Sequence, residues 1–548
     1  MNVLLRIGLQ SLLMIGCLSL QLACTHRGTT LDVQVEQPVL PVLTLKGTNP
    51  VLKLTVVRQD SVSASLNQLT FSLVGTTDLQ DISGICLYGS LPNGHLDSLS
   101  PLTDVLAPDV TVTCHKPIPL NQDTTILWVG LTLRDQVNLR HRIGIRLQDL
   151  SSSNPVRIQP VEPVLLRTGV ALRQHGADGI HTSRIPGLET AVNGDLIAIY
   201  DARYESSRDL QGDIDICMQR STDGGMSWGA VSRVLDQGKW GRLPEKFNGV
   251  SDANILVDRT TGHLYVAGLW MHGVKEAQTG RWIPNLTADS TCWNHQWRGK
   301  GSQPGWDVTE TSQYLLTKSE DNGYTWSEPM NLTRELKNHD WWLAAPAPGH
   351  GITLDDGTLV IPSQGRDVQG RSFSSIVWSK DKGKSWHMSK PAFSNVTECM
   401  AVQLSDGRIM LNMRDNTNRG DSVSNGRRIC VTDDLGETWL EHPTSKKALV
   451  EPTCMASLHK HTYQEQGQTK SILLFLNPES FHKRDHITLK VSYDDGMTWP
   501  SDRKILLDEY AGRGYSCITS INDSLIGVLY ESSQADLVFQ QIGLDELR

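Results

Sequence analysis

One eight-residue motif recurs along the C-terminal two thirds of the chain and constrains its fold more than any other feature. The pattern Ser/Thr-x-Asp-x-Gly-x-x-Trp occurs five times, at residues 221–228, 319–326, 379–386, 432–439 and 492–499. The Asp and Ser/Thr side chains can hydrogen-bond nearby backbone groups, and the Gly supplies the positive φ that a tight turn needs. Each copy therefore predicts a turn that closes a β-hairpin, with the Trp packed back on it.

The spacing of the motif predicts the architecture. Successive copies start 98, 60, 53 and 60 residues apart, so the first interval is about two units long and the region has room for six. Alternating strands such as residues 487–493 flank the copies. Four-stranded units repeated around an axis form a β-propeller. We therefore predict an all-β chain with a six-bladed β-propeller over residues 168–548.

Calcium binding is the main alternative role for the motif. An EF-hand loop needs further oxygen ligands at fixed places and a terminal bidentate Glu, and none of the five copies has them. Five copies are also too many for one active site. His459 and His461 could suggest zinc, but no second ligand cluster accompanies them. We therefore expect the motifs to be structural, and we expect no metal and no other cofactor.

The region before the repeats has a different composition. Residues 25–165 are rich in Val, Leu and Thr, and they alternate in hydrophobicity between turn residues. This pattern is typical of an antiparallel β-sandwich. The region shows no catalytic constellation, so such a domain either binds carbohydrate or acts as a spacer. Cys86 and Cys114 are the one candidate disulfide pair, with free buried thiols as the alternative.

The N-terminus has the features of an export signal. Residues 1–23 carry one positive charge, at Arg6, and then an apolar run that is too short for a membrane span. The run ends just before Cys24, as in a bacterial lipoprotein signal, in which this cysteine is lipidated. Both outcomes stay open: a periplasmic, outer-membrane or cell-surface lipoprotein, or a secreted protein.

The net charge limits the partners. At −9, the protein is expected to repel nucleic acid and anionic membranes, so membrane contact would come only through a lipid anchor. An anionic ligand would need a local basic pocket. We expect a monomer.

The repeats and a second motif together resemble one known family. Five such boxes on one chain are similar to the Asp boxes of bacterial sialidases (neuraminidases), and Arg184, Ile185 and Pro186 match the Arg-Ile-Pro signature of that family. The resemblance runs from about Arg173 to the C-terminus. It implies an exo-α-sialidase that removes terminal sialic acids from glycoproteins and glycolipids. A non-catalytic glycan-binding propeller and an intramolecular trans-sialidase are the alternatives.

The resemblance also implies the substrate-binding residues. Sialidases hold the substrate carboxylate with three arginines, which correspond here to Arg184, Arg414 and Arg484. Arginine suits this role because its planar guanidinium binds a carboxylate through two parallel hydrogen bonds. Arg203 and Asp252 match positions that line the pocket around the sugar's 4-hydroxyl.

The catalytic residues follow from the same resemblance. The substrate carboxylate beside the anomeric carbon would repel an anionic nucleophile, and sialidases use a tyrosine instead. Tyr515 matches this nucleophile, Glu398 the general base that assists it, and Glu531 the acid that holds Arg184. Four aspartates of the segment 201–215 could be the acid/base: Asp201, Asp209, Asp213 and Asp215. We choose Asp209, because family members place the acid before a glycine-containing turn, and this role needs a raised pKa.

A tryptophan-rich insert, residues 281–306, lies in the long interval between the first two boxes. It forms either a rim that stacks on sugars or the core of an ordered loop.

Overall fold

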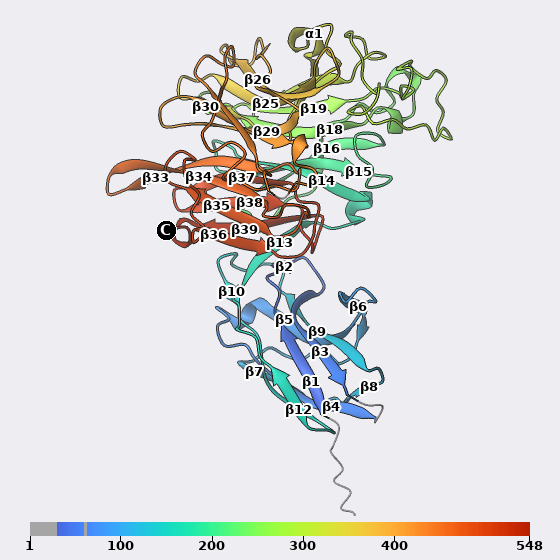
Figure 1. Ribbon diagram of the computed structural model, residues 1–548, viewed down its shortest axis with the longest axis vertical. Helices are drawn as coiled ribbons and strands as arrows, with labels where there is room; N and C mark the ends of the chain where they lie inside the picture. Colours follow the sequence, from blue (N-terminus) through green and yellow to red (C-terminus); the bar gives the residue numbers. More distant parts are fainter. Residues whose placement is uncertain (1–29, 60–62, 422) are drawn as a thin grey trace, which may run out of the picture.

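The structure is a computed structural model that describes residues 30–59, 63–421 and 423–548. The predicted export signal and Cys24 lie outside these residues. Two units are stacked along the long axis, with the smaller N-terminal unit below the larger one (Figure 1). Nearly all regular structure in these residues is β, and the one α-helix among them is the single turn α1 (Thr333–Leu336). Within the described ranges, no helix has the length and apolar character needed to cross a membrane.

The N-terminal unit is the predicted β-sandwich. Its first sheet has the strand order β12-β1-β3-β9-β5-β6, and its second has the order β11-β4-β7, with β8 paired to β4. The first sheet comprises β1 (Leu31–Glu36), β3 (Asn49–Arg58), β5 (Ile82–Ser90), β6 (Leu96–Pro101), β9 (Thr124–Leu133) and β12 (Val156–Gln159). The second comprises β4 (Ala64–Ser72), β7 (Thr111–Cys114), β8 (Ile118–Leu120) and β11 (Arg146–Ser152). Alternate residues such as Leu31, Val33 and Val35 fill the core between the sheets.

The candidate disulfide between Cys86 and Cys114 is wrong, because both thiols are free. Cys114 lies in the core between the sheets. Cys86 lies on the other face of its strand, where it packs against Tyr88 and Trp128. Strand alternation therefore points the two thiols into separate clusters.

The larger unit is the predicted six-bladed propeller, and the four main strands of each blade form one antiparallel sheet. Blade 1 contains β14 (Thr182–Thr190), β15 (Leu196–Arg203), β16 (Ile214–Ser221) and β17 (Ser232–Leu235). Blade 2 contains β18 (Val250–Val257), β19 (Leu264–Trp270), β20 (Gln313–Ser319) and β21 (Met330–Asn331), with β23 (Gly349–His350) beside β18. Blade 3 contains β22 (Leu343–Pro346), β25 (Leu359–Arg366), β26 (Ser372–Ser379) and β27 (His387–Met388), with the short strands β24 (Ile352–Thr353) and β28 (Phe393–Ser394).

The remaining blades complete the ring. Blade 4 contains β29 (Val396–Gln403), β30 (Ile409–Asp415), β31 (Arg428–Thr432) and β32 (Leu440–Glu441). Blade 5 contains β33 (Ser457–Glu465), β34 (Gln468–Pro478), β35 (Ile487–Ser492) and β36 (Lys504–Asp508). Blade 6 contains β37 (Ser516–Asn522), β38 (Leu525–Tyr530) and β39 (Leu537–Gly543), and β13 (Leu166–Arg173) pairs with β39 as its outer strand. The ring is thus closed by strands from the two ends of the propeller sequence.

The five motifs follow the third strands of blades 1 to 5. In the motif at 221–228, the Asp223 carboxylate accepts hydrogen bonds from Ser221 Oγ at 2.8 Å, Ser227 N at 3.0 Å and Ser227 Oγ at 2.6 Å. Trp228 Nε1 donates to the carbonyl oxygen of the motif glycine at 3.0 Å. The motif is therefore a self-contained turn, as the sequence predicts.

The first interval between motifs holds one blade and not two. Its extra length is the insert at residues 271–312, between β19 and β20 of blade 2. The unit without a motif is blade 6, where the ring closes. Spacing alone did not distinguish an insert from an additional blade.

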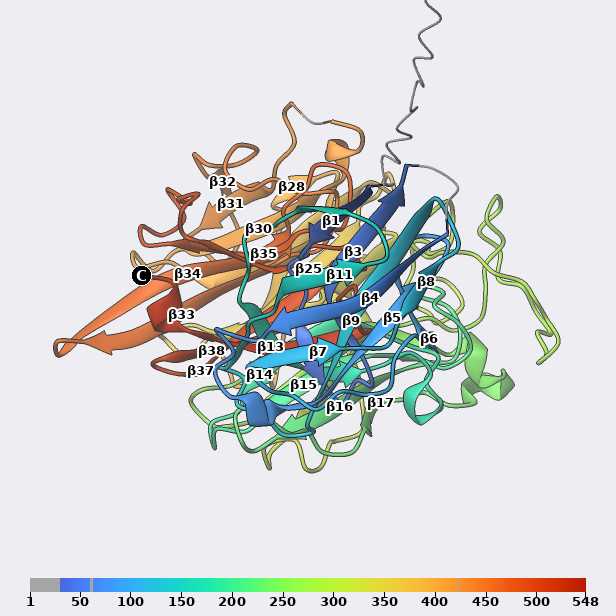
Figure 2. The same cartoon turned by 90° about the horizontal axis from the view of Figure 1, so that it is seen from below.

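The two units share a sheet at their joint. The N-terminal strands β2 (Val42–Thr44) and β10 (Arg142–Ile143) both pair with β13, so blade 6 continues into the N-terminal unit. Seen from below, the strands of the sandwich lie across the underside of the propeller (Figure 2). Arg142 and Arg167 each bind Glu546 with nitrogen–oxygen distances of 2.5 Å.

Candidate active site

Side chains from all six blades converge on one cavity of about 700 Å³. Seven of the nine predicted site residues line it: Arg184, Asp209, Asp252, Glu398, Arg414, Arg484 and Tyr515. Arg203 and Glu531 do not line the cavity but bind residues that do.

Irregular backbone turns several of these side chains into the cavity. Ile185 and Asp252 have φ values of 59° and 60°, which are rare for residues with a Cβ atom. Each lies where the inner strand of its blade shifts register against the next strand. A third shift follows Val396 and precedes Cys399, around Glu398. Such β-bulges change the direction of side chains at the ends of strands, and here they turn side chains into the cavity.

Tyr515 and Glu398 form a buried pair. The Tyr515 hydroxyl donates a hydrogen bond to Glu398 Oε1, and the two residues are 6% and 7% exposed. Arg414 Nη1 lies 2.6 Å from Glu398 Oε2 and 3.2 Å from Tyr515 Oη. Burial, and then the negative charge of Glu398, raise the pKa of Tyr515 well above its usual range. The phenol is therefore neutral at rest and has a proton acceptor in place.

Two further arginines flank the same tyrosine. The guanidinium carbons of Arg184 and Arg484 each lie 5.5 Å from the centre of the Tyr515 ring. The three arginines predicted to bind a carboxylate thus surround one phenol. Arg484 Nη1 also donates to the carbonyl oxygen of Arg513 at 2.9 Å.

Glu531 ties this arrangement together. Its Oε1 accepts from Arg184 Nε at 2.5 Å and from Ile185 N at 3.0 Å, while its Oε2 accepts from Tyr515 N at 3.0 Å. Burial disfavours the charge on Arg184, but Glu531 outweighs that effect and raises the pKa of Arg184. One buried carboxylate therefore orients both an arginine and the tyrosine.

Asp209 is the aspartate of its segment that reaches the cavity. It lies between β15 and β16, and its side chain is 51% exposed. Arg203 Nη2 bridges Asp209 Oδ1 at 2.7 Å and Asp201 Oδ2 at 2.9 Å. Burial raises the pKa of Asp209, but His295, Arg203 and Arg184 together lower it below the usual range of a carboxyl group. These groups therefore favour the ionised form of Asp209.

Asp252 behaves in the opposite way. It is 4% exposed, and Gln364 Nε2 donates to its Oδ2 at 3.4 Å. Burial, followed by the negative charges of Asp209 and other nearby carboxylates, raises the pKa of Asp252 well above its usual range. Burial and the neighbouring negative charges thus favour the protonated form of Asp252, which can donate a hydrogen bond.

Several cavity residues were not predicted from the sequence. The insert of blade 2 contributes His295, Trp297 and Arg298, and blade 3 contributes Gln364. His295 Nε2 lies 3.6 Å from Asp209 Oδ2. Other parts of the insert pack on themselves: Trp282 joins a cluster with Leu243, Phe247, Val274 and Leu286. The insert is thus both a wall of the cavity and an ordered loop core.

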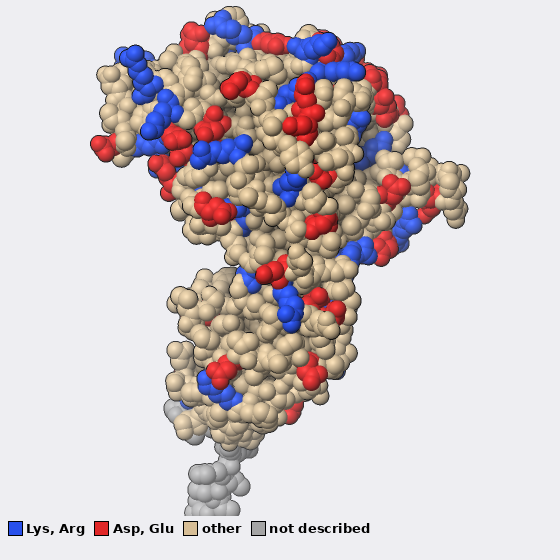
Figure 3. All heavy atoms as spheres, turned by 180° about the vertical axis from the view of Figure 1, so that it is seen from behind, with Lys and Arg blue, Asp and Glu red and all other residues tan. Residues whose placement is uncertain are grey.

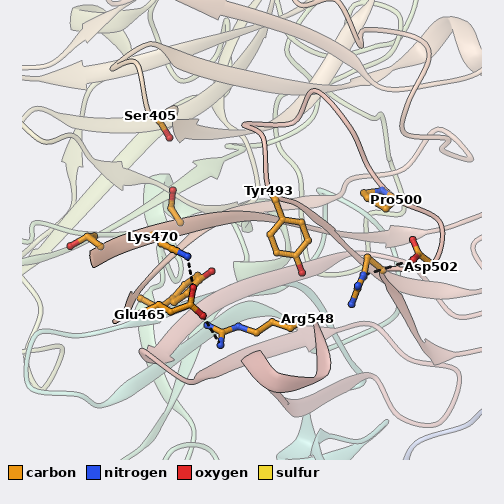
Figure 4. Close-up of a pocket in the computed structure, with 11 residues that line it drawn as sticks. Ser405, Glu465, Lys470, Tyr493, Pro500, Asp502 and Arg548 are labelled. Carbon is orange, nitrogen blue, oxygen red and sulfur yellow. Dashed lines mark hydrogen bonds and ion pairs between the residues drawn. The ribbon is translucent and has the colours of Figure 1, made fainter. Parts of the chain in front are cut away.

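A larger hollow, of about 880 Å³, lies elsewhere on the propeller and receives none of the predicted residues. Its charged groups are paired with one another: Lys470 and Arg548 both contact Glu465 (Figure 4). This pairing leaves little uncompensated charge to bind a ligand.

Possible metal ligands lie outside the cavity. His459 Nε2 and His461 Nδ1 both lie within hydrogen-bonding distance of Ser520 Oγ, at 2.9 and 2.8 Å. Among the residues that the structure describes, the one group with three possible metal ligands in reach is Asp78, Asp81 and His141 of the N-terminal unit.

Comparisons with known proteins agree with this geometry. The family described as "BNR repeat-like domain" matches residues 194–528, and "N-terminal domain of BNR-repeat neuraminidase" matches residues 31–95. The sialidase of Bacteroides fragilis is 34% identical over 535 residues, which cover 90% of this chain and 94% of that protein.

Solved structures are also similar. The Hadza microbial sialidase Hz136 is 33% identical and superposes with a TM-score of 0.84 over 94% of this chain and 100% of its own. The intramolecular trans-sialidase of Ruminococcus gnavus is 17% identical, with a TM-score of 0.52 over 69% of this chain and 98% of its own. The second likeness shows a shared fold alone.

Proposed function

The chain belongs to the family of bacterial sialidases with BNR repeats and is a glycoside hydrolase. We propose that it releases terminal sialic acids with retained configuration and that Tyr515 is the nucleophile. One observation carries this proposal. Arg184, Arg414 and Arg484 surround a buried Tyr515 whose hydroxyl is bonded to Glu398. These residues place a carboxylate-binding site beside a neutral nucleophile. Hydrolysis of a sialoside requires both, because the substrate carboxylate would repel an anionic nucleophile.

Substrate binding begins with the carboxylate. The three arginines bind it through charge-assisted hydrogen bonds. Glu531 already holds Arg184 in place, so little reorganisation is needed when the substrate arrives. Asp252, whose protonated form is favoured by burial, donates a hydrogen bond to a hydroxyl group of the sugar, and Arg203 holds the neighbouring Asp209 in place.

Bond cleavage then needs one acid and one nucleophile. Asp209 donates a proton to the leaving glycosidic oxygen while Tyr515 Oη attacks the anomeric carbon and passes its own proton to Glu398. In the second step, Asp209 removes a proton from water, the water oxygen attacks the same carbon, the bond from that carbon to Tyr515 Oη breaks, and Tyr515 takes back its proton from Glu398. Two displacements at one carbon retain the configuration.

Asp209 must gain a proton before it can act as the acid. In the free site the positive charges of Arg203 and Arg184 oppose protonation. A bound substrate carboxylate offsets the charge of Arg184, and the sugar excludes water from Asp209. Both changes raise the pKa of Asp209 in the complex.

The test combines a variant with product analysis. Wild type should release the fluorophore from a fluorogenic sialoside, and Tyr515→Phe should lose nearly all of this activity. NMR of the first-formed sugar should show the α-anomer of free sialic acid. A first-formed anhydro sugar would identify an intramolecular trans-sialidase, and no release at any pH would leave a glycan-binding propeller.

We further propose that the mature protein is an exported monomer, anchored by lipid at Cys24 or secreted without a lipid. The mass of the mature N-terminal peptide tests this proposal. A chain that retains residues 1–23 would contradict export, and a lipid on Cys24 would distinguish anchoring from secretion.

A further inference from the structure

The cavity carries more positive charge than one substrate carboxylate requires. Seven arginines and three carboxylates line it, although the chain as a whole has a net charge of −9. The arginines are Arg184, Arg298, Arg366, Arg371, Arg414, Arg419 and Arg484, and the carboxylates are Asp209, Asp252 and Glu398. On the face shown in Figure 3, by contrast, side chains of both signs are interspersed over the propeller. The excess of positive charge in the cavity therefore contrasts with the mixed charges of that face.

Two of the seven arginines have no role in the chemistry described above and no partner among the residues that the structure describes. Arg298 and Arg419 are exposed. Over the ranges 30–59, 63–421 and 423–548, neither guanidinium makes a hydrogen bond or an ion pair. They come from the insert of blade 2 and from the segment after β30 in blade 4, so they approach the cavity from different blades. Their charges are available to a ligand.

The backbone that carries Arg298 is held firmly. Arg366, which is 7% exposed, donates from Nη1 to Gln296 O at 3.2 Å and from Nη2 to Gly299 O at 3.0 Å. Its guanidinium carbon lies 4.8 Å from the ring centre of Trp342. Arg366 therefore fixes the insert on both sides of Arg298 and leaves the Arg298 side chain free at the cavity.

The backbone that precedes Arg419 is also fixed. Asn416 N donates to Asn395 O at 3.0 Å, and the buried Asn418 Nδ2 donates to Glu451 Oε1 at 2.7 Å. Both arginines thus extend from ordered segments, and this lowers the entropic cost of ordering them around a ligand.

Arg371 provides a natural contrast. It lines the same cavity, but its guanidinium is paired with Asp367, with a nitrogen–oxygen distance of 2.8 Å. Its charge is therefore already compensated. Of the three arginines Arg298, Arg371 and Arg419, Arg371 is paired with a carboxylate and the other two are not.

We propose that Arg298 and Arg419 form a second anion-binding subsite, which receives a negatively charged group on the penultimate sugar of the substrate. This inference rests on the proposed function, in which Arg184, Arg414 and Arg484 hold the carboxylate of the terminal sialic acid. The rest of the glycan then extends from the cavity past exposed residues. An uncompensated guanidinium in a cleft attracts anions and binds carboxylate or sulfate well.

The anion has two possible sources, namely the carboxylate of a penultimate sialic acid or a sulfate ester. Three substrates on one oligosaccharide scaffold distinguish them: one with a neutral penultimate sugar, one with a penultimate sialic acid and one with a sulfated penultimate sugar. We expect wild type to show a kcat/KM about tenfold higher for an anionic substrate than for the neutral one, because each exposed ion pair contributes about three- to fivefold. The anionic substrate that has the higher kcat/KM identifies the anion that the subsite binds.

Two variants test the assignment. In the double variant Arg298→Gln, Arg419→Gln, the ratio of anionic to neutral kcat/KM should fall to near one. The matched control Arg371→Gln should keep the wild-type ratio, because that arginine is already paired. The wild-type ratio should also fall as salt rises from 20 to 300 mM, since exposed charges are screened.

Three results would overturn the subsite: equal kcat/KM for all three substrates in wild type, a ratio that survives in the double variant, or a ratio that is insensitive to salt. Failure of the proposed function looks different, because wild type would then release sialic acid from none of the three substrates.

Discussion

The carboxylates of the box turns and those of the central cavity are used in opposite ways. In a box turn, the partners of the aspartate lie within four residues: Asp381 accepts from Ser385 N at 2.9 Å and from Ser385 Oγ at 2.6 Å. In the cavity, Glu398 bonds to Tyr515, 117 residues away, and Glu531 to Arg184, 347 residues away. The boxes therefore build the frame locally, whereas the site exists only once the ring has closed.

The electrostatics follow the same division. Hydrogen bonds from nearby hydroxyl and backbone groups lower the pKa of the box aspartates Asp321 and Asp434 to about 2. In the cavity, burial raises the pKa of Asp252 and of Tyr515. Hydrogen bonds thus favour the ionised form of the box aspartates, whereas burial favours the protonated forms of Asp252 and Tyr515 in the cavity.

The largest effect should come from Asp209→Asn, which tests the functional side of this comparison. Loss of the proton donor should lower kcat/KM on a natural glycan about 10³-fold, within the usual range for general acid catalysis. A fluorogenic sialoside with a good leaving group needs less protonation and should lose about tenfold. Steady-state kinetics on both substrates measure the difference, and equal losses on the two would assign the acid role to another group.

Glu531→Gln should have the next largest effect. The variant leaves Arg184 buried without its counter-charge, so kcat/KM should fall about 10²-fold, mainly through KM. Glu531→Asp, which keeps the charge, should recover part of the loss. Calorimetric titration with a sialic acid analogue checks the affinity directly. A loss below about threefold would mean that Arg184 is positioned by other contacts.

The carboxylate of Glu546, at the joint between the two units, combines features of the box turns and of the cavity. Glu546 has partners distant in sequence, as in the cavity, yet its role at the joint is structural, as in the boxes. Burial raises its pKa, but Arg167 and Arg142 outweigh burial and lower it to about 2. A carboxyl group with a lowered folded-state pKa stabilises the protein above its ordinary pKa and loses that contribution as the pH falls toward 2.

Glu546→Gln should therefore cost about 2 kcal/mol of unfolding free energy at pH 7 and little near pH 2. Urea unfolding of wild type and variant at pH 7, 4 and 2.5 measures the difference. A difference that does not change with pH would contradict the ion-pair explanation.

The smallest effect should come from a box turn. Asp223→Ala removes hydrogen bonds from Ser221 and Ser227 and should cost about 1 kcal/mol of stability. It should leave kcat/KM within twofold of wild type. Thr222→Ala, at the exposed neighbouring position, is the control for the substitution itself. A large loss of activity with unchanged stability would contradict the purely structural role of the box turns.

The sequence predicts the parts of this fold that are local and repeated. Each box contains the hydrogen-bonding groups of its own turn, so five copies indicated the propeller. The tryptophan-rich part of the insert at 271–312 was recognised, but the first interval was still interpreted as about two units, because spacing does not show where a blade ends. The failed Cys86–Cys114 pair had a similar cause, because the pairing depends on the faces of two strands in different sheets.

The candidate site was predicted by resemblance more than by physical reasoning. Nothing local to Tyr515 distinguishes it, because the partners of its hydroxyl group, Glu398 and Arg414, come from blade 4. The bulges at Ile185 and Asp252, which aim side chains into the cavity, have no glycine to mark them. Arg298 and His295 lie in an insert without a motif. That these residues lie at one site can be seen only in the folded structure, in which the six blades are brought together.

Closure of the ring by β13 and β39 also has a consequence for synthesis. The ribosome makes β13 first and β39 more than 360 residues later, a delay of roughly half a minute at typical elongation rates. During that time β2 and β10 can cover β13 in part, but its other edge has no partner. Arg184 likewise waits for Glu531 and Tyr515. A prematurely terminated chain would form several blades without Tyr515 and Glu531, so the cavity is complete only in a chain that has been translated through blade 6.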